Sequence, residues 1–338
     1  MVKIGVIGAG FMGAMHSQCY SLMPGAKLVG IADIRKDKGT ELANKFGNAV
    51  FYDNAEDLLN NPEVDAVDIC LPTYLHPEWV IKAAAAGKSV ICEKPIALKV
   101  EDADRMVEAA EKHKVIFMVA QVIRFWPEYV RLKEIYDRKE LGKLVSLYLV
   151  RLSPTPTWGW ENWLGGDARK SGSALVDLHV HDTDYLLYLC GKPKSLYSCG
   201  RKIEGGYCHV LTSFKYPDFI VTAEGGWDFV DTFPFRMAFT ANFEKGAVEY
   251  NSLAAVNPFG VYTKGKSEFP KLVEDTIQAE GGGNVSSLGG FYNEIKYFVE
   301  CVEKGKRPTI VTPEAARDSL ALVLKEYQSA ESGKEIIL

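Results

Sequence analysis

A glycine-rich turn follows the first apolar segment of the chain, in the pattern Gly8-x-Gly10-x-x-Gly13. The first glycine permits a tight turn, the second lets the backbone approach a pyrophosphate, and the third lets the following helix pack closely on the strand. That helix, from about Phe11, would direct its unpaired N–H groups and the positive end of its dipole at the phosphates. The pattern therefore predicts a dinucleotide-binding site.

An acidic residue stands where such a site needs one. Asp33 ends the second apolar run, twenty residues beyond Gly13, and its carboxylate can accept hydrogen bonds from a ribose diol. A glycine-rich turn alone is a weak signal, but a strand before it, a helix after it and an acid at this distance are specific together. We expect NAD to be preferred, because a carboxylate repels a 2′-phosphate. Arg35 and Lys36 could offset that repulsion, so NADP is the alternative.

A second chemistry-bearing segment runs from Ala174 to Leu189. Read as one helix, it places Asp177, His181, Asp184 and Tyr188 in one narrow polar stripe. A helix that is apolar on its remaining circumference is buried, so the stripe must face partners or a cavity. A carboxylate one turn before a histidine can orient the ring and stabilise its protonated form, which suits general acid–base catalysis. A buried network that satisfies itself without a ligand explains the stripe equally well.

The pair His179-x-His181 in this segment resembles a metal-binding motif. On a helix the two side chains point about 160° apart and cannot share one ion. We therefore predict no metal site.

A lysine and a proline close another apolar run, Val90-Ile-Cys-Glu-Lys94-Pro95. The carboxyl end of a parallel strand is where open α/β sheets bind ligands, and an ammonium there could hydrogen-bond a hydroxyl or carbonyl oxygen. Alone, this lysine would equally be a solvated strand end. Pro95 is a candidate for a cis peptide bond, and the loop from Leu71 to His76 is expected at the same edge of the sheet.

The order of the segments indicates the fold. In the first third, short apolar runs alternate with amphipathic stretches, which predicts a parallel, doubly wound sheet of the Rossmann type. We expect strands at Lys3–Ile7, Leu28–Ala32, Ala49–Phe51, Ala66–Leu71, Ser89–Cys92 and Val115–Ala120, and helices near Met12–Leu22, Lys36–Phe46, Ala55–Asn60, Pro77–Ala86 and Val100–His113.

Near Gln121 the pattern changes. Long runs rich in Val, Leu, Tyr and Phe, separated by turn residues, predict a large, mostly antiparallel sheet with helices on one face. The expected strands are Leu144–Leu152, Ser195–Lys202, His209–Tyr216, Phe219–Trp227, Phe235–Asn242 and Ala247–Asn251, and the helices lie near Glu128–Arg138, Leu288–Lys304 and Pro313–Ser332. We predict an α/β protein with a dinucleotide-binding domain at 1–122 and an α+β substrate-binding and oligomerisation domain at 123–338.

The bulk composition excludes several classes. The 338 residues are 47% hydrophobic and 25% charged with a net charge of −5, which is ordinary for a globular enzyme and gives no basic surface for nucleic acid. No apolar run is long enough to span a bilayer, and the N-terminus is a strand rather than a signal peptide. Seven cysteines without CxxC spacing indicate reduced thiols, so we expect a cytoplasmic protein.

Two further segments have alternative readings. Gly260 to Ser267 matches the phosphate-loop expression GxxxxGK[ST], but prolines flank it and no strand–loop–helix context is present, so we reject an ATPase. Thr155 to Trp163 holds three of the six tryptophans, whose faces could stack on sugar rings. A tryptophan-rich interface loop or lid is the alternative.

Taken together, the motifs resemble the Gfo/Idh/MocA oxidoreductases, the family of glucose–fructose oxidoreductase and inositol dehydrogenase. The similarity rests on the glycine-rich turn, Pro72-Thr73-x-x-His76, Glu93-Lys94-Pro95, Gln121-x-x-Arg124-Phe125 and Asp177-x-x-x-His181, and it covers essentially the whole chain. Two departures are Thr73, where asparagine is frequent, and Ser171-Gly-Ser-Ala174, where the family usually has a run of glycines.

The resemblance implies an NAD(P)-dependent dehydrogenase that acts on a sugar, a cyclitol or a sugar derivative, and that forms a homodimer or homotetramer. The residue matching Lys94 and the residue matching His181 would contact the reacting hydroxyl, with the residue matching Asp177 in support. Substrate contacts are expected from Lys94, Arg124, Trp163, Asp177 and His181. Cofactor contacts are expected from Gly8, Gly10, Phe11, Met12, Gly13, Asp33, Ile34, Arg35, Leu71, Pro72, Thr73, His76, Glu93, Lys94 and Gln121.

Two rival functions stay open. An NAD-using glycosidase on the same fold would oxidise and re-reduce its sugar without net release of NADH. A non-catalytic nucleotide-binding sensor is the other rival, although the joint presence of Lys94, Asp177 and His181 argues against it.

Overall fold

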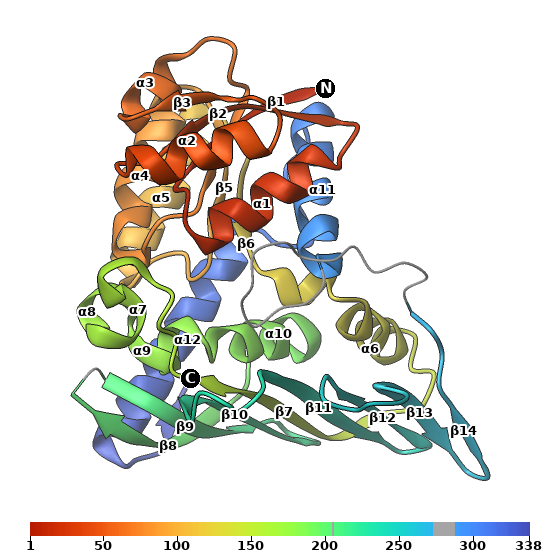
Figure 1. Ribbon diagram of the computed structural model, residues 1–338. Helices are drawn as coiled ribbons and strands as arrows, with labels where there is room; N and C mark the ends of the chain where they lie inside the picture. The colour runs from red at the N-terminus through yellow and green to blue at the C-terminus, as the bar shows by residue number, and fades with distance from the viewer. Residues whose placement is uncertain (205, 273–287) are drawn as a thin grey trace.

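The computed structural model describes residues 1–204, 206–272 and 288–338. Figure 1 shows two sheets, one in each half of the molecule, with helices packed around the first and on one face of the second.

The first sheet contains six parallel strands in the order β3-β2-β1-β4-β5-β6. This confirms the predicted doubly wound sheet, in which strands are added on one side of β1 and then, from β4, on its other side. The strands are β1 (Val2–Ile7), β2 (Ala26–Ala32), β3 (Val50–Tyr52), β4 (Ala66–Ile69), β5 (Ser89–Glu93) and β6 (Phe117–Ala120). The helices are α1 (Phe11–Ser21), α2 (Lys36–Lys45), α3 (Ala55–Asn60), α4 (His76–Ala85) and α5 (Val100–His113). The Lys94–Pro95 peptide bond is cis, as predicted.

The second sheet contains nine strands in the order β14-β13-β12-β11-β7-β10-β9-β8-β15. All neighbouring strands are antiparallel except β7 and β10. The bounds are β7 (Leu144–Pro154), β8 (Ser195–Ile203), β9 (Gly206–Lys215), β10 (Ile220–Phe229), β11 (Arg236–Phe243), β12 (Gly246–Asn251), β13 (Phe259–Thr263), β14 (Lys266–Glu268) and β15 (Ile336–Ile337). The last three strands were not predicted. The phosphate-loop expression falls on the β13–β14 hairpin, which is not a strand–loop–helix unit.

One predicted helix is interrupted. The segment from Ala174 to Leu189 forms α9 (Ser173–Asp177) and α10 (Val180–Cys190), with a turn between them. The reason is a tertiary hydrogen bond: the backbone carbonyl of Asp177 accepts from Lys94 Nζ at 2.8 Å, while the His181 N–H donates to Leu178 O at 3.4 Å. The prediction of one continuous helix was therefore wrong.

Among the described residues, helices cover the inner face of the second sheet and none covers its outer face. In Figure 1, α6 (Pro127–Asp137), α10 and α12 (Pro313–Ser332) lie on one side of it. Strand residues on that side are buried, such as Leu147, Leu149, Val210 and Val221. The opposite face exposes Tyr148, Tyr197, Leu211 and Ile220 by 38–62%.

We predict from this face that the protein is a homo-oligomer, most simply a dimer or a tetramer. Exposed aromatic and branched side chains along neighbouring strands form a surface that a second subunit would remove from water. Multi-angle light scattering at micromolar concentration should give a multiple of 37.5 kDa. A monomer at that concentration contradicts the prediction.

The C-terminal helices return to the first domain. The helix α11 (Gly289–Glu303) packs against α1 and β1, and α12 packs against α5 and β6 as well as β8. The boundary near residue 122 thus separates the two sheets, although the helices at the end of the chain contact both. Within the described residues, no helix is both long enough and apolar enough to cross a membrane.

Candidate active site

A cavity of about 900 Å³ lies between the two domains. Its wall on one side is the carboxyl edge of the first sheet, with residues that follow β1, β2, β4 and β5. Its wall on the other side comes from the inner face of the second sheet and from α9 and α10. Most predicted site residues line it: Gly8, Gly10, Phe11, Met12, Asp33, Ile34, Arg35, Leu71, Pro72, Glu93, Lys94, Trp163, Asp177 and His181.

The glycine-rich turn has the geometry that a dinucleotide site requires. Gly8 has φ +107°, and a Cβ at Gly13 would lie 1.8 Å from the Gly8 carbonyl oxygen. A Cβ at Gly10 would meet no atom within 4 Å, so this stretch of backbone is open to the cavity at the start of α1. The residues present therefore fit the pyrophosphate of NAD.

Asp33 is held in place by four hydrogen bonds. Its carboxylate accepts from the Ala9 N–H and the Arg35 N–H, each at 2.7 Å, and from Arg35 Nε and Nη2 at 2.9 and 2.8 Å. Burial alone would raise the pKa of Asp33, but the hydrogen bonds from Arg35 and Ala9 outweigh it and lower the pKa. The side chain is thus a fixed anion at the end of β2.

Lys94 and Asp177 meet across the cavity from different domains. Lys94 Nζ lies 2.8 Å from the Asp177 carbonyl oxygen and 3.3 Å from its Oδ1. Burial raises the pKa of Asp177, and Lys94 opposes that rise. Both side chains are only 13–15% exposed, so the ammonium is oriented in a largely dry site.

His181 lines the same cavity without the partner that the sequence suggested. Its Nδ1 is buried and has no hydrogen-bond partner, because the break between α9 and α10 leaves the Asp177 carboxylate with Lys94. Burial, reinforced by the charges of Lys94 and Arg151, holds the pKa of His181 well below its usual value. The ring is therefore neutral near pH 7 and able to accept a proton.

Five predicted residues do not reach the cavity. Gly13 packs α1 on the turn, whereas Thr73, His76, Gln121 and Arg124 are buried. The two His76 nitrogens lie 2.9 Å from the carbonyl oxygens of Pro95 and Leu71, so the ring joins two loops at the edge of the sheet.

Arg124 is committed to an internal ion pair. Its Nη2 and Nε donate to the Asp184 carboxylate at 2.7 and 2.8 Å, and its Nη1 donates to Ile310 O. The structure thus gives Arg124 a structural role where the resemblance implied a substrate contact. The Asp184 carboxylate of the predicted polar stripe is therefore bound inside the protein and does not line the cavity.

Sequence reasoning missed a charged cluster beneath the glycine-rich turn. His16 Nδ1 lies 2.8 Å from Asp68 Oδ2, and His16 Nε2 lies 3.2 Å from Glu93 Oε1. Burial opposes protonation of His16, but Asp68 and Cys70 raise its pKa well above the usual value. Glu93 also accepts from the Lys94 N–H at 3.0 Å. His16 thereby braces the strand end that carries Lys94. The one signal in the sequence for this role of His16 is its position eight residues after Gly8, on the helix that follows the glycine-rich turn.

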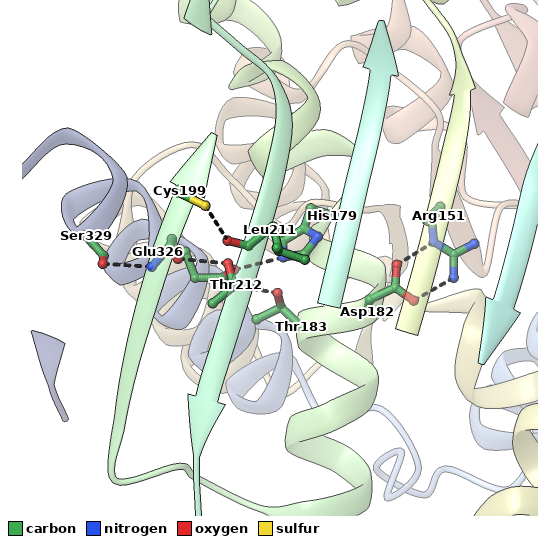
Figure 2. Close-up of polar contacts among 10 residues, drawn as sticks. Arg151, His179, Asp182, Thr183, Cys199, Leu211, Thr212, Glu326 and Ser329 are labelled. Atoms are coloured by element: carbon green, nitrogen blue, oxygen red, sulfur yellow. Dashed lines mark hydrogen bonds and ion pairs between the residues drawn. The ribbon is translucent and has the colours of Figure 1, made fainter. Parts of the chain in front are cut away.

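A second network that the sequence did not reveal lies behind His181. Figure 2 shows Arg151 on β7 bound to Asp182 on α10, at 2.9 and 3.1 Å. In the same view, Glu326 of α12 accepts from Thr183 and Thr212 and lies 2.8 Å from His179 Nε2. These contacts fix α10 between the sheet and α12, and so fix the position of His181. They also show that His179 is part of the protein interior.

Comparison with known proteins agrees with this architecture. Residues 2–121 match the model of an oxidoreductase family with an NAD-binding Rossmann fold, and residues 129–249 match the GFO/IDH/MocA C-terminal domain. The fold and the cavity are thus those of a two-domain NAD-binding oxidoreductase. The chain belongs to the Gfo/Idh/MocA family.

Several relatives have assigned activities. Myo-inositol 2-dehydrogenase of Thermotoga maritima is 35% identical over 191 residues, 56% of this chain and 55% of that protein, so the match spans about half the length of that relative. The scyllo-inositol 2-dehydrogenase (NAD⁺) of Bacillus subtilis is 27% identical over 100% of this chain and 96% of its own. A solved structure of levoglucosan dehydrogenase with NADH and levoglucosan has the same fold, with a TM-score of 0.80, 21% identity and 99% of each chain covered.

Proposed function

We propose that the protein is an NAD-dependent dehydrogenase that oxidises a CH–OH group of a sugar, a cyclitol or a sugar derivative. The observation that carries the proposal is the convergence of Lys94, Asp177 and His181 in the cavity that also contains the glycine-rich turn and Asp33. The curated relatives named as inositol dehydrogenases support the class of substrate.

Lys94, Asp177 and His181 have different roles in the proposed reaction. Bound NAD supplies the hydride acceptor. Lys94 donates a hydrogen bond to the reacting oxygen, and Asp177 holds the ammonium in position through its carbonyl and carboxylate. Neutral His181 accepts the hydroxyl proton as general base, which its lowered pKa permits. The opposite assignment, with Lys94 as the proton acceptor and His181 as the hydrogen-bond donor, is the alternative.

A screen of cyclitols, aldoses and their derivatives for NADH formation tests the proposal. Stoichiometric oxidation of one of them supports a dehydrogenase. Hydrolysis of a glycoside without net NADH would favour the NAD-using glycosidase, and NAD binding without any turnover would favour a sensor.

We predict that NAD binds more tightly than NADP. In this motif the acidic residue would face the ribose 2′-position, and Asp33 keeps its charge because its pKa is lowered. The Arg35 guanidinium is neutralised by that same carboxylate, so it offers little to a 2′-phosphate. Calorimetric titration should show the preference, and Asp33→Ser should shift it toward NADP by freeing Arg35. Tighter binding of NADP to the unmodified protein contradicts the prediction.

A further inference from the structure

Two tryptophans of the second domain stand at the cofactor end of the cavity. Trp158 and Trp160 follow β7, line the cavity, and keep 47% and 44% of their surface exposed. Large aromatic side chains left half exposed beside a cavity indicate a ligand or an interface. Their position indicates a ligand, because both reach across to the domain that carries the dinucleotide motif.

Each tryptophan faces a residue of that motif. The Trp158 ring lies 5.1 Å from the ring of Phe11, which begins α1 beside the phosphate-binding turn. The Trp160 ring lies 5.6 Å from the guanidinium carbon of Arg35, two residues beyond Asp33. In this motif the pyrophosphate would lie at the start of the helix and the adenosine beside the acidic residue, so the first contact would border the pyrophosphate and the second the adenosine.

The segment between them is held at its ends. Thr155 Oγ1 donates to Trp227 O at 2.8 Å, and Leu164 is only 2% exposed. Between these anchors, Glu161 and Asn162 have φ +50° and +53°, a left-handed conformation that costs energy in residues other than glycine. The ends of the segment are therefore fixed, and its middle holds a strained backbone beside the two tryptophans.

We propose that Trp160 and Arg35 enclose the adenine ring of NAD from opposite faces, and that Trp158 closes with Phe11 over the pyrophosphate. This inference rests on NAD binding and deepens the proposed function by assigning part of the cofactor site to the second domain. For a flat ring to fit between two flat groups, those two groups must lie about 7 Å apart, which is twice an ordinary van der Waals contact distance. Since the present spacing is 5.6 Å, Trp160 moves outward by about 1.4 Å to admit adenine. Guanidinium and indole are both groups that stack on such rings.

The two halves of the cofactor provide the test. Calorimetry with ADP-ribose, which contains the adenosine half, should show about tenfold weaker binding to Trp160→Ala, the usual cost of one lost stacking contact. Nicotinamide mononucleotide, followed by ligand-detected NMR, should bind within twofold of the wild type. Trp160→Phe keeps an aromatic face and should recover most of the affinity for ADP-ribose. Trp158→Ala should weaken ADP-ribose binding and speed the release of NADH in stopped flow.

Phe269→Ala is the matched control, because Phe269 is a 45% exposed aromatic residue that does not line the cavity. It should bind both ligands normally. Unchanged ADP-ribose affinity in Trp160→Ala overturns the proposal, and so does an equal loss for nicotinamide mononucleotide, provided circular dichroism shows a folded variant. These measurements need no substrate, so their failure is separate from failure of the proposed dehydrogenase.

Discussion

Replacing His181 with alanine is expected to lower kcat by about 10²–10⁴ and to leave NAD affinity nearly unchanged. The neutral, buried ring is the group in this cavity that is ready to accept a proton, because its pKa is lowered by burial, Lys94 and Arg151. Steady-state turnover on an identified substrate and calorimetric titration of NAD measure the two quantities. His113→Ala is the matched control, since His113 lies exposed at the end of α5 and should behave as wild type. Turnover like that of the wild type in His181→Ala would transfer the role of base to Lys94.

The pH profile supplies an independent readout for the same residue. Because the pKa of His181 in the folded protein is below 6.5, the neutral base stays populated as the pH falls through that value. We therefore expect the acid limb of kcat/KM to lie below pH 6.5, and to disappear in His181→Ala.

Substitutions of Lys94 and Asp177 should affect turnover and NAD binding differently from His181→Ala. Lys94→Ala should impair both turnover and NAD binding, because the end of β5 borders both parts of the cavity. Asp177→Asn keeps the backbone carbonyl that receives Lys94 Nζ at 2.8 Å but replaces the charged contact at 3.3 Å. A lower kcat with unchanged NAD affinity is therefore expected.

The second large effect is on stability. Asp182→Ala should lower the free energy of unfolding by about 3–5 kcal/mol, because it leaves the guanidinium of Arg151 as a buried, unpaired charge. Asp182 is 0% and Arg151 is 2% exposed. Urea denaturation of Arg151→Met, of Asp182→Leu and of the double variant measures the coupling, and the double variant should regain much of what Asp182→Leu loses.

An exposed ion pair serves as the comparison for that experiment. Lys133 and Asp137 pair along α6, where Asp137 is 52% exposed. Asp137→Ala should cost about 0.5 kcal/mol or less. Equal losses for Asp182→Ala and Asp137→Ala would contradict the assignment of Arg151–Asp182 as a buried pair.

Local patterns in the sequence predicted much of this molecule, and tertiary contacts account for most of the remainder. The bounds of Ala55–Asn60, Val100–His113 and Pro313–Ser332 match the structure, because apolar periodicity acts within a few residues and side-chain caps begin the first and the last of these helices. The break after Asp177 is caused by a lysine 83 positions earlier, and no local pattern reports it. The strand Lys266–Glu268 is wholly exposed, so it carries no apolar signal.

In the candidate site, too, local patterns predicted some residues and tertiary contacts determine the others. The glycine-rich turn, Asp33 and Lys94 are recognisable because a strand end specifies their position. Arg124 was assigned to the substrate by resemblance, but its guanidinium is used by Asp184 and Ile310. His16 and Arg151 have no motif of their own. They acquire significance only when the fold brings Glu93 and Asp182 beside them.

The return of α11 and α12 to the first domain has a consequence for biosynthesis. Side chains of α11, including Phe298 and Val299, complete the core around Ile4 and Tyr20, and α12 covers part of α5 and β6. During synthesis, all six strands of the first sheet therefore leave the ribosome long before the helices that cover their apolar surface. The nascent first domain stays incomplete through the whole synthesis of the second, and a fragment ending near residue 122 would keep that surface exposed to aggregation and to chaperones.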